Sequence, residues 1–214
     1  MDFNNLFNQV VDLAKKSAGR LETGNSTVDT ITKVGGGAAL TGILSMILGR
    51  SGGASLTKLG SLAILGNMAY QAYQNYQKSQ QTAQPEITKN EFDVLNSADN
   101  GDASAIILRT MIAAAASDGE ISEDEKALIL KESGDSELTQ WLSQEIEHPI
   151  SVAEIAKTVG NDTALAANVY LAARLVCQQL SRKEIIFLSE LAKALGLDDQ
   201  LVEQLEQQAG FQFL

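Results

Sequence analysis

The sequence predicts an all-α protein, and its signals for helix starts and stops carry that prediction. Three serine–glutamate pairs have the S-x-x-E spacing of a capping box, in which serine and glutamate each accept a hydrogen bond from the other's N–H. These pairs are Ser122 with Glu125, Ser151 with Glu154, and Ser181 with Glu184. Three glycines stand where helix C-terminal caps are expected, at positions 134, 160 and 196. No alternating strand pattern interrupts this part of the chain.

A C-terminal bundle of about seven helices is expected over residues 101–214. Its helices are expected at roughly 102–117, 123–133, 136–147, 152–158, 163–178, 182–195 and 199–209. The segment GEISEDEKALI aligns with QQLSRKEIIFL, so that Ser122 matches Ser181 and Glu125 matches Glu184. This weak internal repeat predicts that the bundle consists of two pseudo-repeats.

The first part of the chain, residues 1–30, is expected to contain an amphipathic helix followed by a polar stretch. Six apolar residues there recur at helical spacing. They are Phe3, Leu6, Phe7, Val10, Leu13 and Ala14. Such a helix can dock onto the rest of the protein, or it can contact a membrane surface or a partner. The sequence leaves both alternatives open.

A glycine-rich apolar helical hairpin is expected over residues 31–76. Small residues recur at every third position in two apolar runs, and such ridges let helix backbones approach closely, as they do in lipid. The ridges are Gly36, Ala39, Gly42 and Ser45 in the first run, and Gly60, Ala63, Gly66, Ala69 and Ala72 in the second. We therefore expect residues 31–76 to associate with a membrane, with Tyr70, Tyr73 and Tyr76 at its interface.

This hairpin differs from a conventional transmembrane helix, because its first run would span only about 22 Å against a hydrocarbon core of about 30 Å. Its ridges also allow self-association, so a homo-oligomer formed through the hairpin is one hypothesis. A flexible glycine-rich arm is the alternative. Residues 77–100 are rich in Gln, Ser, Thr and Asn and contain Pro85, which is typical of a linker.

Charge and rare residues limit the possible functions. The net charge of -11 is uneven: residues 1–85 carry seven Lys/Arg and four Asp/Glu, whereas residues 86–214 carry nine and twenty-three. The acidic second part argues against nucleic acid as a partner. The single cysteine, Cys177, lies in an apolar helical segment and is expected to be buried. With a single histidine as well, His148, the chain offers no catalytic triad or zinc set, and we expect no enzyme activity and no cofactor.

The stretch AAAASDGEISEDEKALIL resembles the second half of a calcium loop through the spacing of Asp118, Gly119 and Glu125. The first and third ligand positions of such a loop are Ala114 and Ala116, so the EF-hand interpretation fails. A tight turn between two helices explains most of the motif. The remaining acidic side chains, Asp118 and Glu120 together with Glu125, are candidate ligands for a weakly bound divalent cation.

Several segments also resemble known families. IILRTMIAAAASDGEISEDEKALI resembles the signature of the TerB-like tellurite-resistance helical domain, and HPISVAEIAKTVGNDTALAANVYLAARLV with SRKEIIFLSELAKALGLDDQLVEQLEQQ is similar to YebE-type inner-membrane proteins of unknown function. The resemblance implies a compact bundle of about seven helices in a bacterial envelope, with Asp118 and Glu125 as metal ligands and Glu120 as a further candidate. The second pseudo-repeat has Gln178 and Gln179 in place of Gly119 and Glu120, which argues against a two-centre site.

These observations favour a non-enzymatic, membrane-associated interaction module linked to envelope or metal/tellurite stress. Residues 31–76 would anchor it at the bacterial inner membrane, and the acidic bundle, on the cytoplasmic side, would receive an unknown protein partner or a cation. One alternative is a metal-assisted or carboxylate-based hydrolase at Asp118, Glu120 and Glu125. Another is a self-associating membrane hairpin. On the leading interpretation, residues 97–214 fold alone, and leucine at Gly42 and Gly66 leaves the unfolding of the bundle intact.

Overall fold

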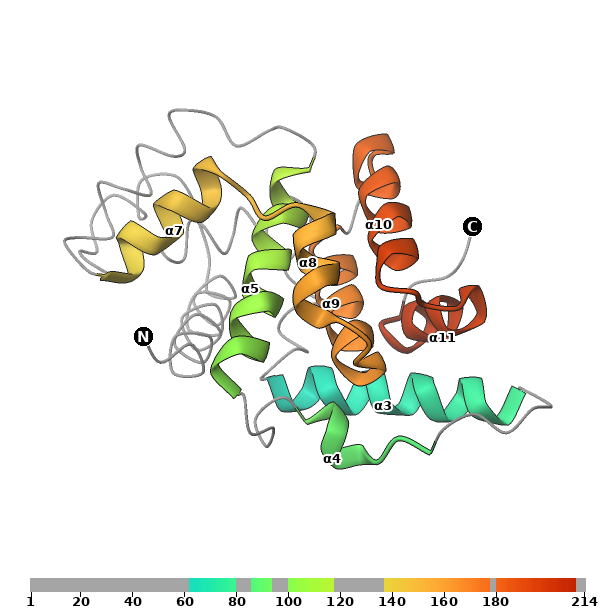
Figure 1. Ribbon diagram of the computed structural model, residues 1–214. Helices are drawn as coiled ribbons and strands as arrows, with labels where there is room; N and C mark the ends of the chain where they lie inside the picture. Colours follow the sequence, from blue (N-terminus) through green and yellow to red (C-terminus); the bar gives the residue numbers. More distant parts are fainter. Residues whose placement is uncertain (1–61, 80–85, 94–99, 118–136, 178–179, 211–214) are drawn as a thin grey trace, which may run out of the picture.

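The computed structural model describes residues 62–79, 86–93, 100–117, 137–177 and 180–210. Within these ranges every regular element is an α-helix, which confirms the predicted all-α class. The helices are α3 (Leu62–Ser79), α4 (Lys89–Phe92), α5 (Asn100–Ala116), α7 (Glu137–Glu147), α8 (Val152–Val159), α9 (Thr163–Val176), α10 (Arg182–Ala194) and α11 (Asp199–Gln208), as Figure 1 shows.

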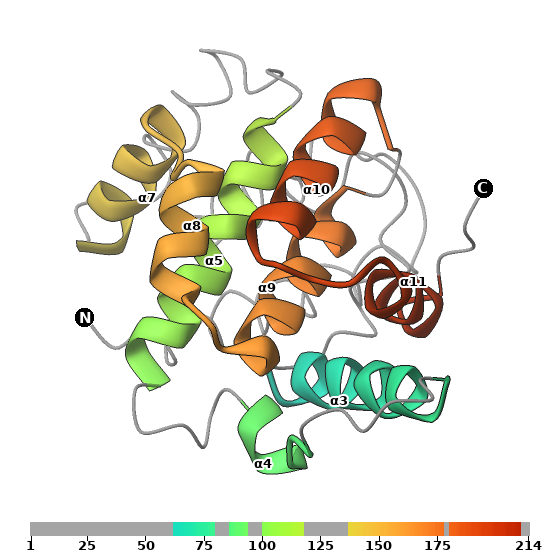
Figure 2. The ribbon, with the colours of Figure 1, turned by 45° about the vertical axis from the view of Figure 1, so that its right-hand side comes forward.

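Helix α9 is the centre of this arrangement. Twelve of its fourteen residues are buried, and many of them are alanines, whose small side chains let neighbouring helices approach closely. Helix α5 packs along α9 on one side, α3 and α11 pack on the other, and α8 and α10 cover it (Figure 2). The other helices are therefore positioned by a helix that is buried almost all round.

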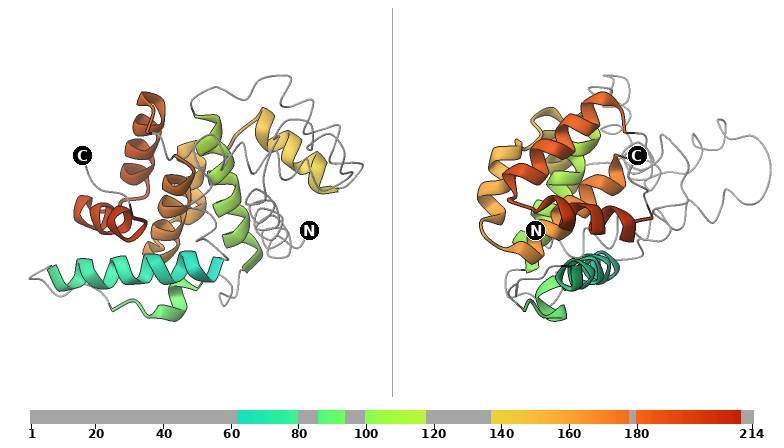
Figure 3. Two further views of the ribbon diagram at one scale, coloured as in Figure 1. Left: turned by 180° about the vertical axis from the view of Figure 1, so that it is seen from behind. Right: turned by 90° about the vertical axis from the view of Figure 1, so that its right-hand side faces the viewer.

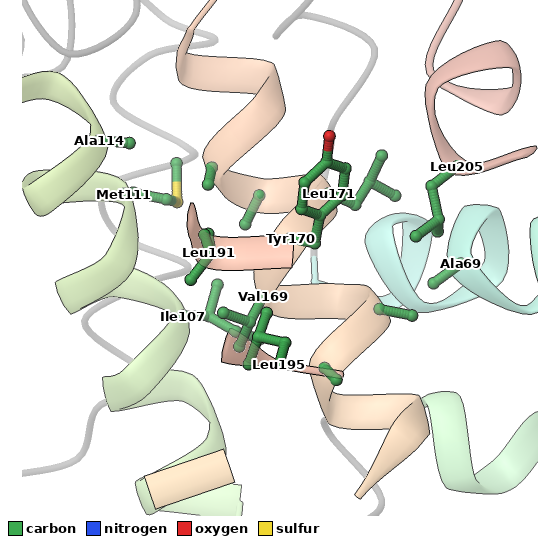
Figure 4. Close-up of a cluster of buried hydrophobic side chains, with 14 of the residues drawn as sticks. Ala69, Ile107, Met111, Ala114, Val169, Tyr170, Leu171, Leu191, Leu195 and Leu205 are labelled. Atoms are coloured by element: carbon green, nitrogen blue, oxygen red, sulfur yellow. The ribbon is translucent and has the colours of Figure 1, made fainter. Parts of the chain in front are cut away.

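The core between α5, α9 and α10 is built from aliphatic side chains. In Figure 4, Ile107 and Met111 of α5 extend toward Val169 of α9 and Leu191 of α10. On the far side of α9, Ala69 of α3 faces Leu205 of α11. One continuous hydrophobic core thus reaches from α5 to α3.

Helix α3 belongs to this core, which differs from the expectation of a separate membrane hairpin ending at residue 76. It packs against α9 and α11, and from behind it runs along the base of both (Figure 3). Tyr73 and Tyr76, expected at a membrane interface, are buried to 3% and 6% exposure. The small-residue ridge is used here too, because Ala69 and Ala72 are fully buried. Close helix packing in the core of a helical domain needs the same small residues as packing in lipid.

Residues 86–93, expected to be part of a linker, also dock on the bundle. The Phe92 side chain is fully buried beside Tyr70 and Tyr73, with ring centroids 5.7 Å and 5.5 Å away. The buried Asn168 donates from Nδ2 to the carbonyl oxygens of Phe92 at 3.1 Å and Ala164 at 2.9 Å. The expected boundary at residue 100 therefore does not separate α3 and α4 from the other described helices.

At Gly66 the backbone of α3 lies close to the end of α4. A β-carbon at this position would collide with the carbonyl oxygen of Phe92, the same oxygen that accepts from Asn168. Only glycine lets the α3 backbone approach α4 this closely. Packing within the core thus explains at least one glycine of the second apolar run.

The predicted helix boundaries in the second half agree with the structure to within a few residues. The helices expected at 102–117, 136–147, 152–158, 163–178, 182–195 and 199–209 correspond to α5 and to α7 through α11. The capping boxes of Ser151 with Glu154 and Ser181 with Glu184 are confirmed. Gly160 and Gly196 stand at helix C-terminal ends as predicted, with positive φ angles of 62° and 66°. A further capping box, Thr88 with Glu91, starts α4 and was not foreseen.

Other predictions lie outside the described residues. These are the amphipathic helix within 1–30, the first apolar run and the turn of the hairpin, the helix at 123–133, the capping box of Ser122 with Glu125, and the cap at Gly134. The two pseudo-repeats stay a prediction, because one of the helices that would define them is the helix at 123–133. Within the described part of the chain, no helix combines the length and the apolar character needed to cross a membrane.

Candidate functional site

The acidic corner that the sequence singles out, Asp118, Glu120 and Glu125, lies outside the described residues. Helix α5 ends just before it, where the Ser117 hydroxyl donates to the carbonyl oxygen of Ala114 at 2.7 Å. The described residues contain no group of three or more His, Cys, Asp or Glu side chains that could hold a metal ion. The cation site at this corner therefore stays a prediction.

Cys177 has the structural role that the sequence predicts. It is fully buried at the C-terminal end of α9, and its N–H donates to the carbonyl oxygen of Ala173 at 3.1 Å. His148 follows α7 directly, and its N–H donates to the carbonyl oxygen of Gln144 at 2.9 Å. The His148 side chain is exposed. Both residues thus stand at the C-terminal ends of helices.

A buried polar cluster ties the end of α9 to α11. Arg174, only 2% exposed, donates from Nη1 to the carbonyl oxygen of Cys177 at 2.8 Å and places Nε 3.3 Å from Oε1 of Glu206. The Tyr170 hydroxyl donates to the same carboxylate oxygen at 2.8 Å. Burial raises the pKa of Tyr170, and the neighbouring Glu206 carboxylate raises it further.

The chemistry of this cluster is that of a structural clamp. Tyr170 is a hydrogen-bond donor at physiological pH, as an ordinary tyrosine is, and its raised pKa keeps it a donor at more alkaline pH as well. Glu206 balances the buried charge of Arg174, which in turn binds a carbonyl group at the C-terminal end of α9. A second ion pair, between the partly exposed Arg109 of α5 and the buried Glu145 of α7 (Nε to Oε1, 2.9 Å), links α7 to α5.

An apolar area exposed on α10 is the strongest candidate for a functional surface. Ile185 and Ile186 are 50% and 52% exposed, and they are the large hydrophobic side chains that stand exposed in the described part of the chain. The opposite side of α10 is buried through Leu188 and Leu191 against α5, α8 and α9. Charged residues of α10 surround the two isoleucines. The α10 surface, as we call it, consists of Arg182, Lys183, Ile185, Ile186, Glu190 and Lys193.

A protein family model matches this chain over a range that starts well before the expected bundle. The family model described as "Protein of unknown function (DUF533)" matches residues 33–209. The chain belongs to this family. The DUF533 match begins before α3 and ends beyond α11, so it includes α3 and α4 together with the helices of the expected bundle. No match was found among curated proteins or among solved structures.

Sequence reasoning missed the α10 surface of this DUF533 chain, although a signal was present. Ile186 precedes Leu188 by two positions, which places it about 160° away around a helix of 3.6 residues per turn. If Leu188 faces the core, Ile186 faces away from it. The apolar residues of the predicted helix that lie off its buried stripe are therefore the signal for this surface.

Proposed function

We propose that this DUF533 chain is a non-catalytic interaction module, which presents the α10 surface to a protein partner and is held at a membrane by residues that precede α3. The exposure of Ile185 and Ile186 is the observation that supports the partner-binding part of this proposal. The remaining parts rest on sequence features.

The α10 surface has the composition of a small protein interface. Single exposed hydrophobic residues are common, but two adjacent isoleucines with a charged rim have the apolar centre and polar edge of a binding site. Complete burial of a fully exposed isoleucine contributes about 1.5–3 kcal/mol, so burial of the exposed half of each side chain in a complex would contribute roughly half of that. In the described structure both side chains are half exposed, so that free energy is still available for binding.

Membrane attachment is proposed for residues 31–61, because the apolar side chains of α3 are used within the core. The first apolar run, VGGGAALTGILSMIL, carries fifteen residues without a charge and supports this part of the proposal. The resemblance to TerB-like domains and to YebE-type inner-membrane proteins supports a place at the bacterial inner membrane, with the helical domain in the cytoplasm and a role in envelope or metal/tellurite stress.

Weak binding of a divalent cation by Asp118, Glu120 and Glu125 remains part of the proposal as a secondary property. The hydrolase alternative depends on the same three carboxylates, which lie outside the described residues, and no observation favours it. Self-association through residues 31–61 is compatible with the module, since it would use a different part of the chain.

Site-specific photo-crosslinking in cells tests the proposed function. A photoreactive residue in place of Ile186 in the full chain should give a crosslinked protein adduct of defined mass on irradiation. The same residue in place of Glu203, exposed on α11, provides the control and should not give that adduct. Absence of any protein adduct specific to position 186 would contradict the proposal.

A further inference from the structure

We draw no further inference here: the strongest candidate, the exposed apolar face of α10 around Ile185 and Ile186, belongs to the surface already described, and nothing in the structure shows what covers it.

Discussion

Gly66 illustrates how one residue decides the position of an element. The missing β-carbon lets the carbonyl group of Phe92 lie directly against α3, and Asn168 holds that carbonyl group from α9. Three segments far apart in the sequence meet at this point. The sequence shows a periodic glycine here, but the partner that requires it becomes visible only in the folded chain.

We predict that Gly66→Ala destabilises the protein. Alanine would favour the helix by about 1 kcal/mol, but its β-carbon would collide with backbone that cannot swing aside, and such overpacking costs about 1–3 kcal/mol. The expected result is a lower free energy of unfolding in urea, followed by circular dichroism. Asn75→Ala, at an exposed position of α3, serves as the control. An unchanged or higher stability of Gly66→Ala would show that α4 can move away.

The structure also changes what is expected of leucine at Gly66. A leucine in a membrane hairpin would leave the unfolding of the bundle intact, whereas a leucine against Phe92 must affect it.

The buried cluster of Tyr170, Arg174 and Glu206 also depends on packing that the local sequence does not show. An arginine in an apolar helix needs a partner, but its choice of carboxylate depends on how α11 packs on α9, which local sequence does not show.

At the scale of elements, local signals predicted the helices of the second half well. Capping boxes and glycine caps act over a few residues, so they can be recognised without knowledge of the packing. Helix α4 was missed because it has four residues in a polar stretch and is held by the long-range burial of Phe92. Helix α3 packs in the core, whereas its ridge of small residues had indicated a membrane, because such ridges occur both in lipid and in alanine-rich cores.

The capping box of α8 gives a prediction about pH. Hydrogen bonds from the Ser151 hydroxyl and N–H hold the pKa of Glu154 below its ordinary value of 4.5. A carboxyl group with a lowered pKa in the folded state contributes stability above its unfolded pKa, and this contribution is lost as pH falls through the folded value. Glu154→Gln should therefore lower the thermal midpoint at neutral pH, and the difference from the wild type should shrink in acid.

Thermal melts of both proteins from neutral pH to about pH 3 provide the measurement for this linkage. Glu86→Gln changes an exposed glutamate outside the helices and serves as the matched control for loss of one charge. A constant difference between Glu154→Gln and the wild type over the whole range would show that the glutamate charge is not part of the cap.

At the scale of the whole molecule, α3 and α4 complete the core on the side of α9 and α11. The family match from residue 33 to 209 covers the same helices. The sequence-based division placed the start of the folded domain near residue 101, because composition changes there. Composition describes what a segment contains, but the extent of the core depends on which apolar faces pack together. The apolar face of α3 packs against α9 and α11.

The last prediction concerns a chain that begins at residue 97. Such a fragment loses four large buried side chains, Leu65, Tyr73, Tyr76 and Phe92, and leaves their contact surfaces on α9 and α11 exposed. At about 1.5–3 kcal/mol for each, the loss is on the order of 6–12 kcal/mol, comparable with the total stability of a typical domain of about 5–15 kcal/mol. Residues 97–214 should therefore bind a hydrophobic dye and unfold without a sharp transition, whereas a fragment that starts at residue 62 should melt cooperatively. Circular dichroism melts and dye fluorescence of the two fragments compare them directly, and a sharp transition of the shorter one at the same temperature would mean that α3 and α4 are dispensable for the core.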